Sequence, residues 1–541
     1  TAQKNDLRTN PSGGLDTDDD TAKERLAFIK GDRSEEGKKF RKRSSVLGDF
    51  VHSNPVYVGP PEIGWPDEEP FGTTAKPYSS FVAQYQDPNP ARDEVLYIGS
   101  NDGMLHGFNA TTGDEVMAYI PSSLFSTSTS EGLHYLSDPN YLHRYYVDLA
   151  PTISDVFYSD SWKTILIGGL RAGGRGVFAL DVTNPSSFSA SNVLWEFTDN
   201  DLGHTFSQPE IALVKTASNT YKWAAIFGNG YNDNPGGDGM AKLFILLIEG
   251  GLDGTWTLGT DYFVITTEAG GTADRNGLSS PSVVDVDQDG IADRVYAGDL
   301  EGNMWAFDLS GATTQWKVAY KNGNTPAPLF SANANQPITA APVVVKHPSV
   351  TGSAPNALVL FGTGKYFENG DPAITDDQSF YGIWDHGEKN LTQSDLIQQT
   401  ITDGSLRTIT DNAVDYSASP NPDDGWYINL PATGERVVTN PMVRGDIVYF
   451  NTSIPETNPC EYGGYGMLMS VDYSNGGTPD QAVFDSNGDG VIDSDDLNYV
   501  GVKFNGGLPS APNFLGDYRY VTGTKTATGS TTGIGYDATL G

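Results

Sequence analysis

The sequence predicts an all-β fold, a modified β-propeller most simply built from seven blades with elaborated loops. Three observations favour this class. A unit of three short strands recurs six times at uneven spacing along the 541 residues. The chain has 62 glycines, 27 tyrosines and 24 phenylalanines, a composition typical of short strands joined by tight turns. No apolar run approaches the length of a membrane-spanning helix, so we expect no direct insertion into a membrane.

The recurring unit begins with a strand that follows a proline, continues with an apolar strand, and ends with an aromatic strand that is often closed by aspartate. The starting prolines are Pro55, Pro151, Pro209, Pro281, Pro342 and Pro441. The second strands are predicted at 95–99, 164–168, 224–228, 294–298, 359–362 and 447–450. The third strands are predicted at 105–109, 176–181, 243–247, 304–308, 379–385 and 467–472. A ring of such units leaves few sheet edges exposed. A blade shared by the two chain ends would make seven, and a pair of β-sandwiches is the alternative.

Two domains are expected. Residues 1–45 are polar and form a lead-in segment, in which the acidic cluster at 16–20 is predicted to cap a short helix over 21–29. Residues 46–541 are predicted to form the propeller. Since the sequence starts at Thr1 without a methionine or a signal-like segment, we interpret it as a piece of a longer or processed protein.

The net charge of -36 excludes electrostatic binding of nucleic acid or of an anionic lipid surface. Such a charge instead suits divalent cations and an extracytoplasmic setting. Cys460 is the single cysteine, so a disulfide within this chain and any CxxC or haem-attachment motif are excluded. We expect either a buried free thiol or a partner cysteine outside this segment.

The acidic run at 285–293 is predicted to bind calcium between two strands. It presents oxygens in the order of an EF-hand loop, with a glycine at position 6 for the tight turn. The ligands at positions 1, 3, 5, 7 and 9 would be Asp285, Asp287, Asp289, the carbonyl of Ile291, and Asp293. Tyr296 stands at position 12 in place of a bidentate carboxylate, which predicts weaker or more hydrated binding. The alternative is an acidic surface turn.

A second acidic run at 485–496 fits the twelve-position pattern more completely and resembles dockerin-type calcium loops. Its ligands would be Asp485, Asn487, Asp489, the carbonyl of Val491, Asp493 and Asp496. Position 12 is an aspartate, whose shorter reach requires a local shift or a bridging water. Calcium is therefore the one cofactor that the residues themselves suggest.

Catalytic signatures are absent: the sequence contains no GxSxG, HExxH or P-loop motif. His52 and His106 are interpreted as structural. The segment 96–113 resembles blades of pyrroloquinoline-quinone propellers, so a quinone-dependent dehydrogenase is the enzyme alternative. Against that alternative, the Thr-Gly blade motif is clear only once, and one cysteine cannot form the adjacent-cysteine disulfide of some of those enzymes.

Two tripeptides match adhesion motifs. Arg444, Gly445 and Asp446 match the integrin-binding Arg-Gly-Asp motif, and the Lys-Gly-Asp at 30–32 is a related form. The first lies between two predicted strands, so it is interpreted as a hairpin turn rather than as an integrin contact.

Four segments together resemble the C-terminal domain of PilY-type proteins, the tip-associated type IV pilus biogenesis factors and adhesins. These segments are 40–59, 97–113, 362–366 and 459–464. The resemblance covers nearly the whole chain. It implies a modified propeller from a longer precursor and a periplasmic, outer-membrane or cell-surface location at the pilus tip. It also implies a calcium loop whose ligands map onto Asp285, Asp287, Asp289, Ile291 and Asp293.

In that family, calcium occupancy is tied to the balance between pilus extension and retraction. The resemblance therefore implies a non-enzymatic role in pilus biogenesis, twitching motility and adhesion, with minor pilins and host-cell or abiotic surfaces as partners. Two other hypotheses stay open: the quinone-dependent dehydrogenase, and an adhesin in which calcium is purely structural.

Overall fold

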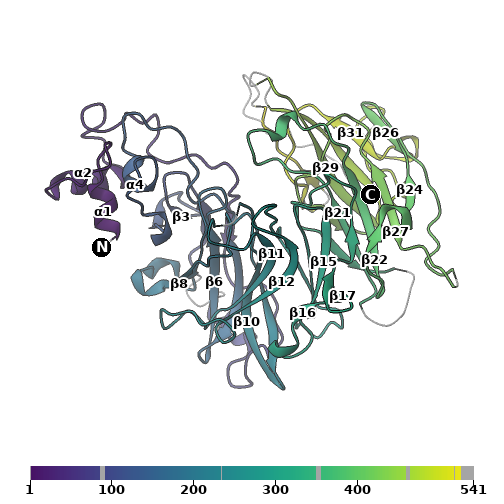
Figure 1. Cartoon of the computed structure of the whole chain (residues 1–541), viewed down its shortest axis with the longest axis horizontal. Coiled ribbons are helices and arrows are strands. Elements are labelled where there is room, and N and C mark those ends of the chain that lie inside the picture. The colour runs from purple at the N-terminus through teal and green to yellow at the C-terminus, as the bar shows by residue number, and fades with distance from the viewer. Residues whose placement is uncertain are drawn as a thin grey trace. The chain divides into compact units, whose positions relative to one another are not determined.

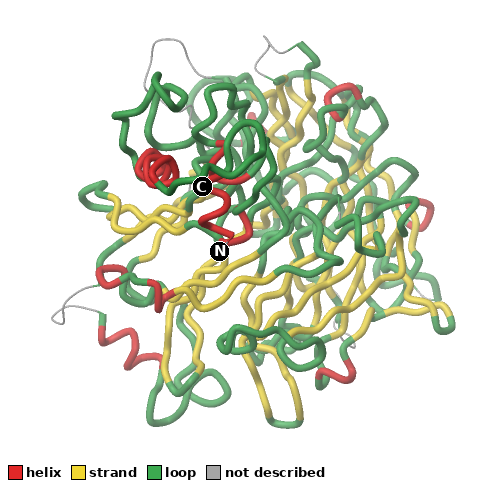
Figure 2. The backbone as a smooth tube through the Cα atoms, turned by 60° about the vertical axis from the view of Figure 1, so that its left-hand side comes forward, coloured by secondary structure: helices red, strands yellow, loops and turns green. Residues whose placement is uncertain are grey.

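The computed structural model describes residues 2–85, 92–232, 234–348, 355–418, 420–458, 463–516 and 518–525; Cys460 lies outside them. Strands dominate this part of the chain, and its helices are short (Figure 2). The chain divides into two compact units. Unit 1 comprises Thr1–Val264 and Gly271–Gly277, and unit 2 comprises Ile265–Gly270 and Leu278–Gly541. Across the described ranges, no helix combines the length and hydropathy that a membrane span requires.

The strands of unit 1 form antiparallel four-stranded sheets, several of whose strands are labelled in Figure 1. The first sheet has the order β1 (Val56–Val58), β2 (Val95–Gly99), β3 (Leu105–Asn109), β4 (Glu115–Tyr119). The second has the order β5 (Thr152–Tyr158), β6 (Ser161–Gly169), β7 (Val177–Asp181), β8 (Val193–Phe197). The third begins with β9 (Glu210–Ala217), β10 (Thr220–Gly228) and β11 (Met240–Leu247). Its fourth strand is β12 (Tyr262–Gly270), of which Tyr262–Val264 belong to unit 1 and Ile265–Gly270 to unit 2.

The sheets of unit 2 are larger and less regular. One contains β13 (Ser282–Val284), β14 (Arg294–Gly298), β15 (Asn303–Asp308), β16 (Lys317–Val318), β19 (Phe330–Ser331) and β23 (Leu391–Thr392). Another contains β20 (Val343–Lys346), β21 (Ala357–Gly362), β22 (Ser379–Asp385), β27 (Gly425–Asn429) and β24 (Ile397–Gln399). A third contains β28 (Met442–Arg444), β29 (Ile447–Pro455), β30 (Gly464–Asp472), β31 (Gly501–Phe504), β26 (Leu406–Ile409) and β25 (Ile401–Thr402). Unit 2 also contains two separate two-stranded sheets: β17 (Tyr320–Asn322) with β18 (Thr325–Ala327), and β32 (Asn513–Leu515) with β33 (Tyr518–Tyr520).

The predicted three-strand units are confirmed. Each starting proline stands directly before the first residue of a first strand, and the second and third strands cover the predicted ranges except for Gly176, which precedes β7. Proline suits this place because its missing N–H removes nothing from the ladder that follows. The second and third strands pair antiparallel in every unit, as in β2 and β3, where Val95 faces Asn109 and Gly99 faces Leu105. Strand order and composition thus agree with a propeller, while the seven-blade count stays a prediction.

Apolar side chains of the middle strands form the core of each unit. In unit 1 a buried cluster joins Val95, Tyr97 and Leu105 to Leu166 and Phe178 of the next sheet. In unit 2 corresponding clusters are built from residues of β14, β15, β21 and β22, and from residues of β22, β29 and β30. Burial of these strands on both faces explains why they are apolar runs rather than alternating patterns.

The lead-in segment contains the predicted helix and one that the sequence did not suggest. The described helices are α1 (Ala2–Arg8), α2 (Asp20–Ile29), α3 (Tyr78–Gln84) and α4 (Gly132–Tyr135). The acidic cluster caps α2 in part. The carboxylate of Asp18 accepts a hydrogen bond from the N–H of Asp20, the first residue of α2, at 3.0 Å, whereas the N-cap residue Asp19 makes no side-chain capping hydrogen bond. Its carboxylate instead accepts a hydrogen bond from Lys4 at 2.7 Å. This ion pair joins the N-cap of α2 to α1; both helices are labelled in Figure 1.

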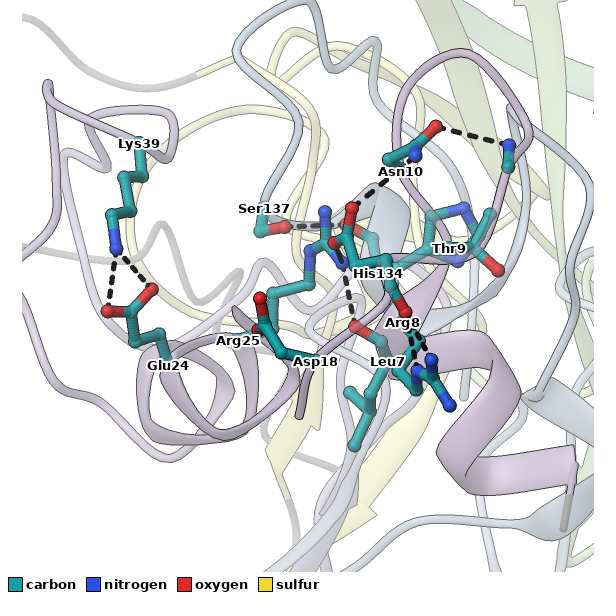
Figure 3. Close-up of polar contacts among 12 residues, drawn as sticks. Leu7, Arg8, Thr9, Asn10, Asp18, Glu24, Arg25, Lys39, His134 and Ser137 are labelled. Atoms are coloured by element: carbon teal, nitrogen blue, oxygen red, sulfur yellow. Dashed lines mark hydrogen bonds and ion pairs between the residues drawn. The ribbon is translucent and has the colours of Figure 1, made fainter. Parts of the chain in front are cut away.

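Polar contacts hold residues 1–45 together, and several of them are drawn in Figure 3; others attach the segment to the rest of unit 1. Arg25 donates a hydrogen bond to the carbonyl of Leu7 at 2.7 Å, and Lys39 donates to both oxygens of Glu24 at 2.7 Å. The carboxylate of Asp6 is fully buried and accepts hydrogen bonds from the backbone N–H groups of Ser126, Leu133 and His134. The lead-in segment is therefore a structural part of unit 1.

The Arg-Gly-Asp tripeptide forms the turn between β28 and β29, where Arg444 pairs with Ile447. Gly445 has a φ of 58°, which glycine adopts without strain. The guanidinium of Arg444 donates to the carbonyl of Gly516 and lies 5.3 Å from the ring centroid of Phe514. The arginine is thus engaged within unit 2, which supports the interpretation of the motif as a hairpin turn.

Candidate metal site

The first loop, residues 285–293, connects β13 to β14 in unit 2. The two strands pair up to the loop, with Val284 opposite Arg294, and the N–H of Asp293 donates to the carbonyl of Val284 at 3.0 Å. Ile291 and Ala292 are buried at 8% and 3% exposure and anchor the end of the loop in the core. The prediction that this loop joins two strands is confirmed.

Three carboxylates meet at the tip of the first loop. One side-chain oxygen from each of Asp285, Asp287 and Asp289 lies within 4.8 Å of the others, with Asp285 half-buried and the other two exposed. Three oxygens at this separation are close enough to coordinate one metal ion. The residues present therefore fit a divalent cation, and three of the predicted ligands are brought together.

Backbone amides hold this acidic tip in shape. The carboxylate of Asp285 accepts hydrogen bonds from the N–H groups of Gln288 and Gly290, each at 2.6 Å. Asp289 accepts from the N–H of Ile291 at 2.9 Å. Gln288 and Gly290 have positive φ angles of 65° and 83°, which turn the chain sharply enough for these contacts. The glycine predicted for the tight turn performs that role.

Asp293 closes the loop rather than extending the carboxylate cluster. Its side chain accepts a hydrogen bond from the N–H of Val286 at 3.0 Å, which ties the end of the loop to its beginning. Its carbonyl accepts from the N–H of Leu309 at 2.8 Å, after the neighbouring strand β15. The fourth predicted carboxylate is thus adjacent to the cluster but has a structural contact of its own.

Electrostatics at this tip favour a cation. Burial raises the pKa of Asp289, and the charges of Asp287 and Asp285 raise it further. Burial likewise raises the pKa of Asp293, with a contribution from the charge of Asp287. Both shifts show that negative charge is costly here, and a divalent cation would relieve this cost.

Tyr296, at the position where an EF-hand has its bidentate carboxylate, does not face the loop. Its side chain is fully buried, and its hydroxyl donates to the carboxylate of Asp385 on β22 at 2.6 Å. The hydroxyl of Tyr320 donates to the same carboxylate. The residue at position 12 of the loop pattern is therefore part of the core. Sequence spacing does not reveal this placement.

A groove of about 660 Å³ lies beside the first loop and was not predicted from the sequence. It is lined by Val284, Asp285, Val286, Gln288, Val344, Val345, Lys346, Pro355, Asn356 and Ala357. The lining combines valines from β13 and β20 with three residues of the acidic loop, Asp285, Val286 and Gln288. The proximity of β13 and β20, not any local motif, creates this groove.

The second loop, residues 485–496, repeats the local hydrogen bonds of the first. Asp485 accepts from the N–H groups of Gly488 at 2.7 Å and Gly490 at 2.9 Å. Asp489 accepts from the N–H of Val491 at 2.8 Å. The amide nitrogen of Asn487 donates to Asp489 at 3.0 Å, so this side chain directs a donor at a neighbouring ligand candidate.

Asp496 closes the second loop. It is fully buried and accepts from the N–H and hydroxyl of Ser486, at 2.7 and 2.6 Å, and from the N–H of Asp493 at 3.2 Å. The hydrogen bonds from Ser486 hold the pKa of Asp496 below its usual value. Asp493 accepts from the N–H of Asp495 at 2.9 Å and caps a short 3-10 helix, Ser494–Asp496. Among the described residues, the second loop contains no group of three acidic side chains close enough together to hold one metal ion.

The two histidines singled out in the sequence have carboxylate partners in unit 1. His106 is buried, with Nδ1 2.6 Å from Glu115 and Nε2 3.1 Å from Asp102. Burial opposes protonation of His106, but the two carboxylates outweigh it and raise its pKa. His52 lies 2.7 Å from the buried carboxylate of Asp148. Both contacts agree with structural roles.

Comparison with known proteins defines the family. Residues 47–416 match the model of the PilY1 beta-propeller domain. The type IV pilus biogenesis factor PilY1 of Pseudomonas aeruginosa (strain PAK) is 36% identical over 542 residues, which cover 91% of this chain and 44% of that protein. The chain belongs to the PilY1 family.

Other comparisons agree with that membership. A PilY1 homolog of Xylella fastidiosa is 35% identical over 496 residues, covering 84% of this chain and 31% of that protein. The crystal structure of the Pseudomonas aeruginosa PilY1 C-terminal domain matches with a TM-score of 0.67 and 31% identity, over 86% of this chain and 98% of that one. The PilY1 match favours a propeller over paired sandwiches. The chain spans less than half the length of these curated relatives.

Proposed function

We propose that this chain is the calcium-binding propeller portion of a type IV pilus biogenesis factor, seven-bladed and non-enzymatic. It would support pilus extension and retraction, twitching motility and adhesion. The observation that carries the proposal is the carboxylate triad of Asp285, Asp287 and Asp289 within a chain of the PilY1 family. The proposed location is extracytoplasmic, at the pilus tip, outer membrane or cell surface, with minor pilins and host-cell or abiotic surfaces as partners.

Calcium is the proposed ion because the candidate ligands are all oxygens. Hard cations take carboxylate and carbonyl oxygens, and calcium tolerates irregular coordination by six to eight of them, including water. Asp285, Asp287 and Asp289 would bind directly, and the carbonyl of Ile291 and the carboxylate of Asp293 complete the proposed set. Water would fill the position for which Tyr296 provides no ligand.

The second loop is proposed as a weaker calcium site. Its candidate ligands are Asp485, Asn487, Asp489, the carbonyl of Val491, Asp493 and Asp496. The hydrogen bonds that engage Asp496 and Asn487 would have to rearrange for all of them to coordinate an ion. That reorganisation lowers the affinity expected for the second loop.

The proposed mechanism acts through the groove beside the first loop. A bound cation would cancel the repulsion between carboxylates and fix the positions of Asp285 and Gln288. Both residues belong to the loop and line the groove. Calcium would then bias the groove toward one conformation, and a pilus protein that binds this conformation would detect occupancy.

Isothermal titration calorimetry with calcium is the first test, comparing the wild type with Asp287→Asn. Asp287 is exposed and Asn keeps its shape, so a loss of affinity reports the missing charge. The expected loss is about ten-fold or more. Glu301→Gln is the matched control, because it removes one exposed carboxylate from the next hairpin turn and should leave binding unchanged. Asp489→Asn tests the second loop in the same titration.

Asp287→Asn in the full-length factor then tests the pilus role. The expected result is altered piliation or twitching at normal protein level, while Glu301→Gln behaves as wild type. Normal pili with a calcium-deficient variant would reject the regulatory mechanism and favour a structural cation. Dye-linked oxidation of alcohols after addition of pyrroloquinoline quinone would reject the non-enzymatic assignment.

A further inference from the structure

A second cavity, of about 690 Å³, lies within unit 1 and is independent of both acidic loops. Its lining comes from residues far apart in the sequence, including Arg144 and Tyr145, Gly173 and Gly174, Arg175, and His204. This volume is in the range of pockets that bind small molecules.

The charge of this lining is opposite to that of the chain. The whole chain has a net charge of -36, yet the described lining contains two arginines and two histidines against the single carboxylate of Glu131. Glu131 pairs with Arg144 at 3.7 Å, and both side chains are about half exposed, so the pair is weak. The cavity is thus a local basic site on an acidic protein; Asp233 lies outside the described residues and outside this count.

Arg175 is the central cation of this lining. One terminal nitrogen donates to the carbonyl of Asn232 at 3.2 Å, while its Nε is buried and has no hydrogen-bond partner among the described residues. Burial lowers the pKa of Arg175, and the nearby charge of Arg275 lowers it further. A half-buried guanidinium beside another cation is stabilised by an anion.

His204 is the second nitrogen-bearing side chain of this lining. Its Nδ1 is buried and makes no hydrogen bond within the described part of the chain. Burial and the charge of Arg175 lower the pKa of His204, while hydrogen bonding to the backbone of Asn232 and Tyr231 opposes this shift. Arg175 and His204 therefore line one cavity, and each has a buried nitrogen without a partner among the described residues.

We propose that this cavity binds a small ligand through an oxyanion, a carboxylate or a phosphate. Arg175 would hold the oxyanion, His204 would lie beside it in the lining, and Arg144 would attract it from the exposed side. Planar guanidinium groups match the geometry of both anions, which is why the two are treated as one chemistry.

Calorimetric titration of the whole chain with inorganic phosphate and with glucuronate separates the two sources. The buffer should be freed of metals with a chelating resin, because a soluble chelator is itself a polycarboxylate and would compete. We expect saturable binding of at least one probe at millimolar concentration or below, weakened by added salt. Arg175→Gln should weaken it at least ten-fold, and Arg144→Gln several-fold.

Two controls keep the test decisive. Lys321→Gln removes one exposed cation from strand β17 of unit 2 and should not change the affinity. Arg175→Lys retains the charge without the fork and should lose part of the affinity while retaining the thermal stability of the wild type. Binding that survives both Arg175→Gln and Arg144→Gln would overturn the proposal, as would the absence of saturable heat with either probe at low salt.

Discussion

The two acidic loops of unit 2 share a local hydrogen-bonding pattern but differ in what surrounds it. In both, the first aspartate accepts from the N–H groups three and five residues later, and the fifth position accepts from the seventh. The first loop closes through Asp293 at position 9, and the second through Asp496 at position 12. Similar spacing has therefore produced two different closures.

Anchoring explains the difference. The first loop connects two paired strands, and Ile291 at position 7 is buried at 8% exposure. Val491 at the same position of the second loop is 55% exposed. The paired strands fix both ends of the first loop, and Asp293 closes it. The other three carboxylates, at positions 1, 3 and 5, are therefore gathered at the tip. The second loop uses its own carboxylate as the anchor. A ligand pattern thus makes a carboxylate cluster only where other contacts hold the loop.

Truncation at position 7 should show the largest difference between the loops. Ile291→Ala is expected to lower the stability of unit 2 by about 2–4 kcal/mol, because it removes a buried side chain. Val491→Ala should change it by less than about 0.5 kcal/mol. Differential scanning calorimetry of both variants measures these changes. Both substitutions keep the backbone carbonyl at position 7, which is a candidate ligand. Equal effects would contradict the difference in anchoring.

Cation removal should affect the first loop more than the second. At calcium concentrations about 100-fold above the dissociation constant, binding stabilises the folded state by about 2.7 kcal/mol. Hydrogen exchange followed by mass spectrometry, with and without calcium, should show protection concentrated in 285–293. Protection confined to 485–496 would reverse the ranking of the two sites.

Completing the acidic cluster in the second loop should strengthen it. Asn487→Asp gives 485, 487 and 489 the same residues as 285, 287 and 289. It also replaces the amide that donates to Asp489 with a repelling carboxylate. We expect calcium affinity to rise by roughly three- to ten-fold and stability without calcium to fall. Calorimetry on this variant in the Asp287→Asn background isolates the second loop, and unchanged affinity would show that closure by Asp496 prevents binding.

The smallest change in affinity is expected for Tyr296→Phe. The variant removes a buried hydroxyl that donates to Asp385, which should cost about 1–2 kcal/mol of stability. Calcium affinity should equal that of the wild type, since Tyr296 contributes no ligand. Affinity that falls together with stability would indicate that β14 and Asp385 influence the loop.

Much of the fold was predictable from local rules. Prolines before first strands and the β-branched and aromatic runs that follow them identified the six strand units, which the structure confirms. Capping of α2 by the acidic cluster is confirmed for Asp18, which accepts from the N–H of Asp20, but not for Asp19, whose carboxylate accepts from Lys4, fifteen residues away. Helix α1 and its attachment through Asp6 also depend on partners more than a hundred residues distant.

The sequence by itself determined the strand repeats, the acidic character and the order of oxygens in both loops, since these follow from neighbours a few residues apart. Only the tertiary structure decided which loop gathers its carboxylates, that Tyr296 points into the core, and that Arg144, Arg175 and His204 line one cavity. The physical reason is that strand pairing fixes backbone position across long sequence separations. Burial and charge at a site depend on those distant neighbours, which local spacing does not encode.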